Sequence, residues 1–193
     1  MRKLIYSMGV SLDGYVIGPD GRYDWATPDE ELHRFHNEQT AALGAHLLGR
    51  RLYEEMLPWE TEEQPGAVRS EFSEAWEALD KVVFSTTLDA VEGSSRLATA
   101  GIAEEVARLR EQPGGDIAVG GPGLAAGVIR LGLMDEYHLF VNPIVVGGGT
   151  PFFPILDAPI DVALAETRTF GSRVLYLRYR STAAPGSRPA AEC

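Results

Sequence analysis

The feature that most constrains the fold of this chain is a regular alternation of short apolar segments with longer amphipathic ones. Apolar segments of strand length lie at residues 3–9, 45–49, 81–85 and 116–120. Segments in which apolar residues recur at helical spacing separate them. Strands joined by helical crossovers run parallel, and helices then cover both faces of the sheet. The alternation therefore predicts an α/β fold with a mostly parallel sheet.

The amphipathic segments predict the helices. The first begins with Thr27 as its N-cap and Pro28 at its first position, with acidic residues in the first turn. Helices are expected at residues 27–43, 50–56, 67–79, 103–112 and 123–132.

The C-terminal part predicts an antiparallel addition to the sheet. Further strands are expected at residues 135–146, 162–170 and 173–181. The last two flank a Gly-Ser pair at 171–172 and are typical of a hairpin. No internal repeat or linker interrupts residues 1–181, so we expect one domain there. Residues 182–193, rich in Pro, Ala and Gly, predict a disordered tail.

Charge and cysteine content narrow the class of protein. The 193 residues carry 28 acidic against 17 basic side chains, a net charge of −11, which disfavours nucleic acid as a partner. The single cysteine, Cys193, excludes an intrachain disulfide. No apolar stretch approaches the length of a membrane span, and the apolar run at the N-terminus is too short for a signal peptide. We expect a soluble, cytoplasmic protein.

The segment "DIAVGGPGLAAGVIRLG", residues 116–132, places three glycines and a proline between a strand and a helix. Unpaired backbone N–H groups and the helix dipole make such a junction suitable for an anion, and glycine lets the anion approach the backbone. The segment lacks the GK[ST] ending of a P-loop and the G-x-G-x-x-G spacing of a Rossmann fingerprint. A tight strand-to-helix turn without a ligand explains it equally well.

A second strand end carries two cations. Gly49 is followed by Arg50 and Arg51 at the start of a predicted helix. Arginine forks suit phosphate oxygens, and a helix N-terminus is unfavourable for two cations unless an anion is bound. The alternative is a pair of i,i+4 ion pairs with Glu54 and Glu55.

A third strand end, in "KVVFSTTL", carries the hydroxyls of Ser85, Thr86 and Thr87. Ligands of open parallel sheets gather at the carboxyl ends of the strands. Three strand ends with glycine, arginine or hydroxyl groups therefore predict a site for a phosphorylated ligand.

The motifs "SLDGYVIGPDG", "LLGRRLYE", "VVFSTTL" and "AVGGPGLAAGVIRLGLMDEYHLFVNPIVVGGGTPFF" follow one another within residues 2–180. In this order they resemble the dihydrofolate reductase-like superfamily, and within it the reductase-domain family that includes the C-terminal half of the bifunctional riboflavin-biosynthesis deaminase–reductase. The resemblance implies a three-layer α/β fold, an NADPH-dependent reductase and a homodimer. It also implies a small-molecule substrate, of which 5-amino-6-(5-phosphoribosylamino)uracil is the best known in the family.

The resemblance also implies which residues bind the cofactor. The Gly-Arg-Arg turn matches the position beside the adenosine phosphate, the hydroxyl pair borders the 2′-phosphate, and the glycine loop lies on the pyrophosphate. Thr86 stands where many relatives carry an arginine, which leaves the choice of NADP over NAD to the two arginines. The first loop closes over the nicotinamide, where an apolar pair abuts the carboxamide. The residues implied are Val16, Ile17, Gly49, Arg50, Arg51, Ser85, Thr86, Gly120, Gly121, Pro122, Gly123 and Leu124.

Two acids are candidates for the catalytic group. Asp13 lies beside a glycine in the first loop, where an Asx turn is the alternative role. Glu30 is the best match, among Asp29, Glu30 and Glu31, to the helix acid that contacts the pterin ring in dihydrofolate reductases. Acids in a first helical turn also complement the helix dipole, which is the simpler interpretation.

The segment "NPIVVGGGTPFF" predicts a substrate platform at one mouth of the sheet. Asn142, Gly148 and Phe152 are its candidate contacts, with Phe152 or Phe153 stacking on a planar ring. A core or dimer contact is the alternative for the phenylalanines.

No metal site is expected. The four histidines lack metal-ligand spacing, and His33 and His36 are expected on a solvated helix face. The H-x-E and P-C-x-x-C signature of zinc deaminases is missing. The alternatives to a riboflavin-type reductase are a reductase of another pterin, flavin or carbonyl compound and a non-catalytic nucleotide-binding dimer domain.

Overall fold

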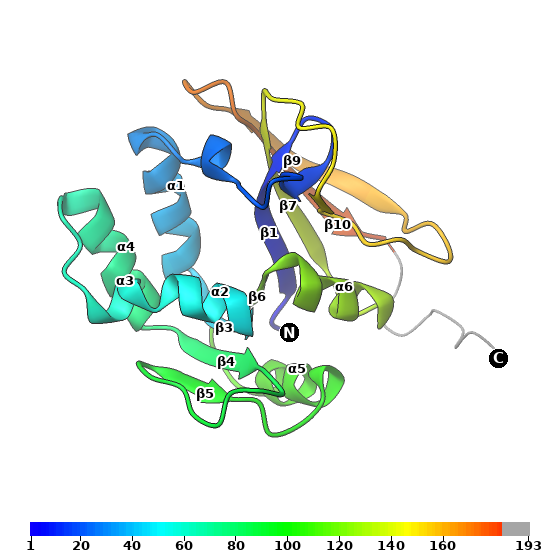
Figure 1. Ribbon diagram of the computed structural model, residues 1–193. Helices are drawn as coiled ribbons and strands as arrows, with labels where there is room; N and C mark the ends of the chain where they lie inside the picture. Colours follow the sequence, from blue (N-terminus) through cyan, green and yellow to red (C-terminus); the bar gives the residue numbers. More distant parts are fainter. Residues whose placement is uncertain (183–193) are drawn as a thin grey trace.

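The computed structural model describes residues 1–182 of the chain. Eight strands form its main sheet: β1 (Leu4–Ser11), β3 (Leu43–Gly49), β4 (Asp80–Phe84), β5 (Ser95–Leu97), β6 (Asp116–Gly120), β7 (Glu136–Asn142), β9 (Val162–Thr169) and β10 (Leu175–Ser181). Their order across the sheet is β5-β4-β3-β6-β1-β7-β10-β9 (Figure 1). The first six are parallel, and β10 pairs antiparallel with β7 and with β9. The mostly parallel sheet with a C-terminal antiparallel hairpin is confirmed.

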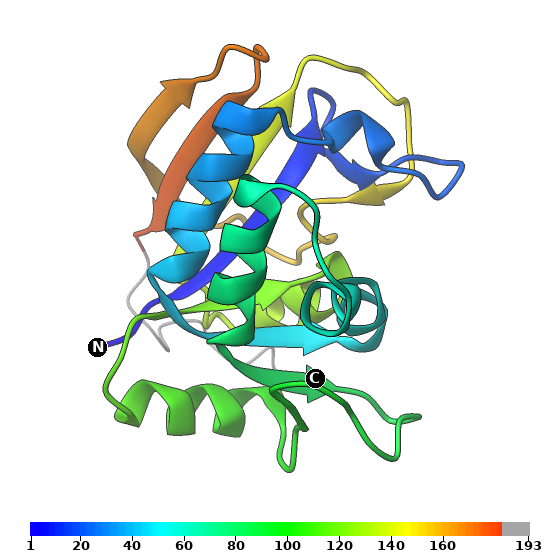
Figure 2. The ribbon, with the colours of Figure 1, turned by 90° about the vertical axis from the view of Figure 1, so that its left-hand side faces the viewer.

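Helices cover both faces of this sheet, as the alternation predicts. The helices are α1 (Glu30–Ala41), α2 (Arg50–Met56), α3 (Pro58–Thr61), α4 (Ala67–Glu77), α5 (Ile102–Glu111) and α6 (Pro122–Arg130). Figure 2 shows α1 and α4 side by side in front of the strands, and α5 and α6 lie on the other side in Figure 1. A short 3-10 turn (Asp24–Ala26) precedes α1, and a small second sheet pairs β2 (Tyr15–Ile17) with β8 (Thr150–Pro151).

The two faces of the sheet are packed differently. Along β1, Leu4 and Tyr6 belong to the largest buried cluster, together with Val106 of α5 and Val128 of α6. The residues that alternate with them point toward α1, as the strand period of two requires. On that side a smaller cluster joins α1 to β7 and β10, with Phe140 at its centre. A further cluster, around Trp76 of α4, packs α4 against β3 and β4, and the cavity described below adjoins it.

Local signals misplace two element ends. The N-cap of α1 is Asp29, not Thr27, because the Asp29 side chain accepts a hydrogen bond from the N–H of Leu32 at 2.9 Å. The C-terminal hairpin turns through a longer loop than the Gly-Ser pair. Phe170 donates its N–H to the carbonyl of Val174, and Arg173 adopts a φ of +67° between them. The strand expected at 135–146 ends at Asn142.

The structure also contains three short strands, β2, β5 and β8, that the sequence pattern does not predict. The predicted tail at 182–193 lies outside the described residues, apart from Thr182.

Candidate functional site

Three strand ends converge at one edge of the main sheet. Gly49, at the end of β3, pairs with Phe84 at the end of β4, and Leu48 pairs with Gly120 at the end of β6. The segments that follow, at the starts of α2 and α6 and in the loop after β4, therefore lie side by side. The three ends that the sequence singles out form one edge of the molecule (Figure 1).

The glycine loop combines three different requirements. A Cβ on Gly120 would lie 2.2 Å from Leu52 Cδ2 and 2.6 Å from His46 Cε1, so packing within the protein excludes a side chain there. Gly121 is the N-cap of α6 and adopts a φ of +87°, which a glycine reaches without strain. Gly123 has open space where a Cβ would be. Only this last glycine keeps the backbone approachable from outside.

The first turn of α6 leaves backbone N–H groups available to an anion. The N–H groups of Gly123 and Leu124 lie in the first turn, where a helix supplies no carbonyl partner. Pro122 stands at the first helical position, where its missing N–H costs nothing. Leu124 also places α6 against β3, since a Cβ on Gly49 would lie 3.8 Å from Leu124 Cβ.

The two arginines of α2 differ in their contacts. Arg50 donates from Nε to Glu54 at 2.7 Å and from Nη1 to Thr87 Oγ1 at 2.8 Å. The first of these is the i,i+4 ion pair considered from the sequence, and the second ties α2 to the loop after β4. Arg51 is exposed and forms no ion pair with any residue between 1 and 182. Arg51 is therefore the cation left available to an anionic ligand at this edge.

The hydroxyls after β4 also divide by role. Ser85 Oγ accepts hydrogen bonds from the N–H groups of Thr87, at 3.1 Å, and Leu88, at 3.0 Å. Its side chain thus closes a local turn. Thr86 is exposed at the tip of this turn.

Asp13 holds two loops together. Its carboxylate accepts from the N–H of Val146 at 3.1 Å and of Gly147 at 2.7 Å. Partial loss of hydration raises the pKa of this carboxyl, but hydrogen bonds from the Ser11 side chain and from these backbone N–H groups outweigh it, so the net pKa is lowered. Asp13 remains ionised and positions the loop that carries β2.

The apolar pair of that loop is only partly exposed. Val16 belongs to the main core, and Ile17 packs against it. A Cβ on Gly149 would lie 2.0 Å from the carbonyl oxygen of Ile17, so the two loops meet backbone to backbone. Both features fix the loop beside the carboxyl end of β1.

A cavity of about 570 Å³ lies between the α1 side of the sheet and helices α1, α2 and α4. Its floor includes Ser7 and Gly9 of β1 and Ala118 of β6. Leu52 and Met56 of α2 form one wall. Because Leu52 also packs against the glycine loop, the cavity adjoins the edge where the three strand ends meet.

All four histidines of the chain line this cavity: His33, His36, His46 and His138. Burial lowers the pKa of His36 and of His46 to about 4 each. The expectation that His33 and His36 lie on a solvated face is wrong, because His36 packs on Phe140 with ring centroids 4.3 Å apart. Its helical spacing with Leu32 and Phe35 was the signal that could have placed it on the inner face. No group of residues suited to a metal ion occurs among residues 1–182.

None of the three acids at the start of α1 lines the cavity. Asp29 caps the helix, Glu30 pairs with Arg34 at 3.0 Å, and Glu31 pairs with Arg168 at 3.0 Å. These contacts match the simpler interpretation of first-turn acids, and they place Glu30 outside the cavity.

The expected substrate platform is not assembled. Asn142 is buried, and its amide donates to the carbonyl of Phe140 at 3.0 Å. Phe152 is buried against Tyr6, with ring centroids 4.2 Å apart, on the face of the sheet opposite the cavity. Gly148 lies in the exposed loop before β8. Phe152 therefore has the core role that was its alternative.

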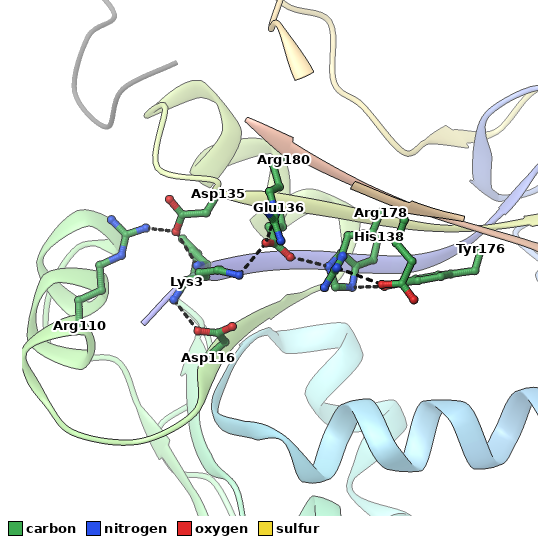
Figure 3. Close-up of polar contacts among 11 residues, drawn as sticks. Lys3, Arg110, Asp116, Asp135, Glu136, His138, Tyr176, Arg178 and Arg180 are labelled. Carbon is green, nitrogen blue, oxygen red and sulfur yellow. Dashed lines mark hydrogen bonds and ion pairs between the residues drawn. The ribbon is translucent and has the colours of Figure 1, made fainter. Parts of the chain in front are cut away.

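A chain of polar side chains, which sequence reasoning missed, runs along the cavity wall (Figure 3). Gln39 Nε2 donates to Tyr176 Oη at 3.0 Å, and Tyr176 Oη lies 3.1 Å from His138 Nδ1. His138 Nε2 lies 3.1 Å from Oε2 of Glu136, and Lys3 Nζ donates to the other oxygen of that carboxylate, Oε1, at 2.9 Å. The geometry fits a neutral His138 that accepts from Tyr176 and donates to Glu136. Hydrogen bonds thus link the cavity wall to Lys3, which precedes β1.

Burial decides the protonation states in this chain. It raises the pKa of Tyr176 to about 12. It also lowers the pKa of His138, against the opposing effect of the Glu136 carboxylate. The strand period of two places Glu136, His138 and Phe140 on one face of β7, and this spacing was the signal available in the sequence.

The fold is similar to that of the dihydrofolate reductases. Dihydrofolate reductase from Enterococcus faecalis, solved in complex with NADP(H), shares the fold with a TM-score of 0.62 at 15% identity, over 94% of this chain and 97% of that one. The chain belongs to the RibD C-terminal domain family, whose match spans residues 2–176. The resemblance to that family is thereby confirmed.

Two further relatives support this assignment. The protein YyaP of Bacillus subtilis (strain 168) is 31% identical over 181 residues, which are 92% of this chain and 94% of that protein. A diaminohydroxyphosphoribosylaminopyrimidine deaminase/5-amino-6-(5-phosphoribosylamino)uracil reductase of Thermotoga maritima has a TM-score of 0.66 at 16% identity, over 93% of this chain and 56% of that one. Among residues 1–182, no helix is long and apolar enough to cross a membrane.

Proposed function

We propose that this protein is an NADPH-dependent oxidoreductase that reduces a small heterocyclic or ribosylamino substrate. Family membership supports a reductase, because the Thermotoga maritima relative is named as a reductase of a ribosylamino pyrimidine. The Enterococcus faecalis relative supports the cofactor, because it was solved with NADP(H). We further propose that the protein acts in the cytoplasm.

The observation that carries the proposal is the position of Leu52. This side chain packs against Gly120 and Gly121 and also lines the cavity. A dinucleotide whose diphosphate lay on Gly123 would therefore have a neighbouring cavity for the reacting end. In this arrangement Arg51 and Thr86 would border the adenosine phosphate.

The bound cofactor would supply a hydride. The residues of this chain would orient the two reactants and exclude water from the space between them. Leu52 and Met56 supply an apolar wall next to the glycine loop. Asp13 and the β2–β8 pair keep the first loop in place at the carboxyl end of β1.

Cofactor binding is tested by the melting temperature and dissociation constant measured with NADPH and with NADH. A ligand that binds only the native state raises the melting temperature by mass action. Charge-assisted hydrogen bonds contribute about 1.5–3 kcal/mol, so we expect Arg51→Gln to weaken NADPH binding about tenfold or more and to change NADH binding little. Arg130→Gln, an exposed arginine at the other end of α6, is the matched control.

Absence of a melting shift with either nucleotide at millimolar concentration would refute the cofactor assignment. Equal weakening by Arg51→Gln and Arg130→Gln would refute the role of Arg51.

We also propose that the protein is a homodimer. The last strand of the sheet, β9, is exposed along all of its residues, with Val162 40% and Leu164 55% exposed. An exposed edge strand of eight residues is a template for pairing with a second copy. Light scattering after size-exclusion chromatography tests this, and a Leu164→Lys variant should shift the mass toward the monomer.

A further inference from the structure

The volume and the lining residues of the cavity beside α1 indicate which class of substrate it can hold. The strand ends proposed to bind the cofactor do not. The cavity volume, about 570 Å³, is in the range of pockets that enclose small organic ligands. One side is aromatic. Trp59 and Phe72 meet edge to face with centroids 4.7 Å apart, and Phe72 lies parallel to Trp76 at 6.0 Å. Flat aromatic walls favour a planar ring.

The charges that line the cavity leave no cation free for a phosphate. Its charged residues are Asp116, Glu166 and Arg178, two carboxylates and one guanidinium. Arg178 donates to Glu166 at 3.0 Å, and so its charge is already balanced. The histidines do not add charge at neutral pH, because burial lowers the pKa of each.

The two cations that contact the aromatic side of the cavity, Lys81 and Arg69, are also engaged. Lys81 lies behind Trp76, 5.2 Å from its ring centroid, and is paired with Glu60 at 3.1 Å. Arg69 stacks on the solvent side of Trp59 at 4.6 Å and donates to Gln64. Phosphate groups in proteins are met by free arginines, lysines or uncapped helix N-termini. The N-terminus of α1, which adjoins the cavity at Pro28 and His33, is capped by Asp29.

We propose that this cavity takes an uncharged, planar heterocyclic ring that carries no phosphate. The proposal rests on the reductase function above and narrows its substrate class, away from phosphoribosyl compounds and toward unphosphorylated ones. The polar contacts would come from the neutral side chains of the wall, among them Ser7, Gln39 and His138, which offer both donors and acceptors to the edge of a ring. The aromatic side would cover its face.

Riboflavin and riboflavin 5′-phosphate form a matched pair of probes, because they differ only in the phosphate. Isothermal titration of the full chain with each should show riboflavin binding at least about tenfold more tightly, since a phosphate would be desolvated beside carboxylates. Glu166→Gln releases Arg178, and so should strengthen binding of the phosphate form and narrow the ratio.

The Ala118→Leu variant tests whether riboflavin binds in this cavity. Ala118 lies on the floor, so a larger side chain there should abolish riboflavin binding, whereas NADPH keeps its contacts outside the cavity, at Gly123 and Arg51, and should still raise the melting temperature. Ala107→Leu makes the same change on the exposed side of α5 and should leave both unchanged. If Ala118→Leu does not fold, the wild-type ratio and Glu166→Gln still decide the question.

Equal or tighter binding of the phosphate form to the wild type would overturn the proposal, and so would failure of both flavins to bind. The NADPH melting shift, measured on the same preparations, separates the two proposals. A shift without flavin binding leaves the reductase function and rejects this substrate class. Flavin binding without an NADPH melting shift leaves this ligand class for the cavity and rejects the reductase function.

Discussion

The glycine loop makes a prediction in which two neighbouring glycines behave oppositely. In Gly123→Ala, the new Cβ enters open space in the first turn of α6, where alanine is the better helix former by up to about 1 kcal/mol. In Gly120→Ala, the new Cβ would meet Leu52 Cδ2 at 2.2 Å and His46 Cε1 at 2.6 Å. Overpacking of this kind costs about 1–3 kcal/mol.

These free energies convert into melting temperatures. For a chain of this size, 1 kcal/mol shifts the midpoint by about 2–4 °C. Gly120→Ala should therefore lower the melting temperature by roughly 2–12 °C. Gly123→Ala should leave it unchanged or raise it slightly. Differential scanning fluorimetry of the apo proteins measures both.

NADPH affinity should be affected in the opposite order, more by Gly123→Ala than by Gly120→Ala. The Cβ of Gly123→Ala would stand where the diphosphate approaches the backbone, so we expect affinity to fall about tenfold or more, which corresponds to about 1.4 kcal/mol. A Gly123→Ala variant that binds NADPH as the wild type does would contradict the position assigned to the diphosphate. A Gly120→Ala variant of unchanged stability would contradict the packing argument.

Two further predictions concern stability. Asp29→Ala should lower the free energy of unfolding by about 1 kcal/mol, because it removes the N-cap of α1, and Thr27→Ala should lower it by less. Urea titration of both variants compares the two effects. A larger effect of Thr27→Ala would contradict the assigned cap. Glu105 is fully buried and held by Arg96, whose hydrogen bond keeps its pKa at about 2 against an ordinary 4.5. A depressed pKa stabilises the fold above pH 4.5, so this contribution, about 3 kcal/mol, should be lost as the pH falls toward 2. In urea titrations the advantage of the wild type over Glu105→Gln should shrink over that interval, and a constant difference would count against the ion pair.

The parallel sheet and the meeting of its strand ends at one edge could be predicted because their signals are local. Each central strand is an apolar run of five to eight residues followed by a helix with its own periodicity. Gly49, Ser85 and Gly121 each follow such a run directly, and the rule that parallel strands end at one edge brings them together. Nothing beyond sequence order and period was needed.

The short strands could not be predicted in this way. The strand β8 is only Thr150–Pro151, and β2 is Tyr15–Ile17, which is too short for a period to be visible. Their pairing depends on the contact between loops that Asp13 and Gly149 make, and this contact joins segments more than 130 residues apart in the chain. The sequence singles out Asp13 as a site candidate. Its role in joining two loops depends on tertiary contacts, which the sequence pattern does not show.

The cavity shows why lining residues are harder to predict than loop residues. His36 on α1 and Phe140 on β7 follow the same sequence spacing as core residues. A side chain that faces a cavity and one that faces the core lie on the same face of a helix or strand, so the spacing does not distinguish them. What distinguishes them is how closely α1 approaches the sheet. Polar side chains lie between the two elements, where Gln39 of α1 and His138 of β7 both hydrogen-bond to Tyr176 of β10. A polar residue on an otherwise apolar face is therefore the informative signal, and the histidines of this chain carry it.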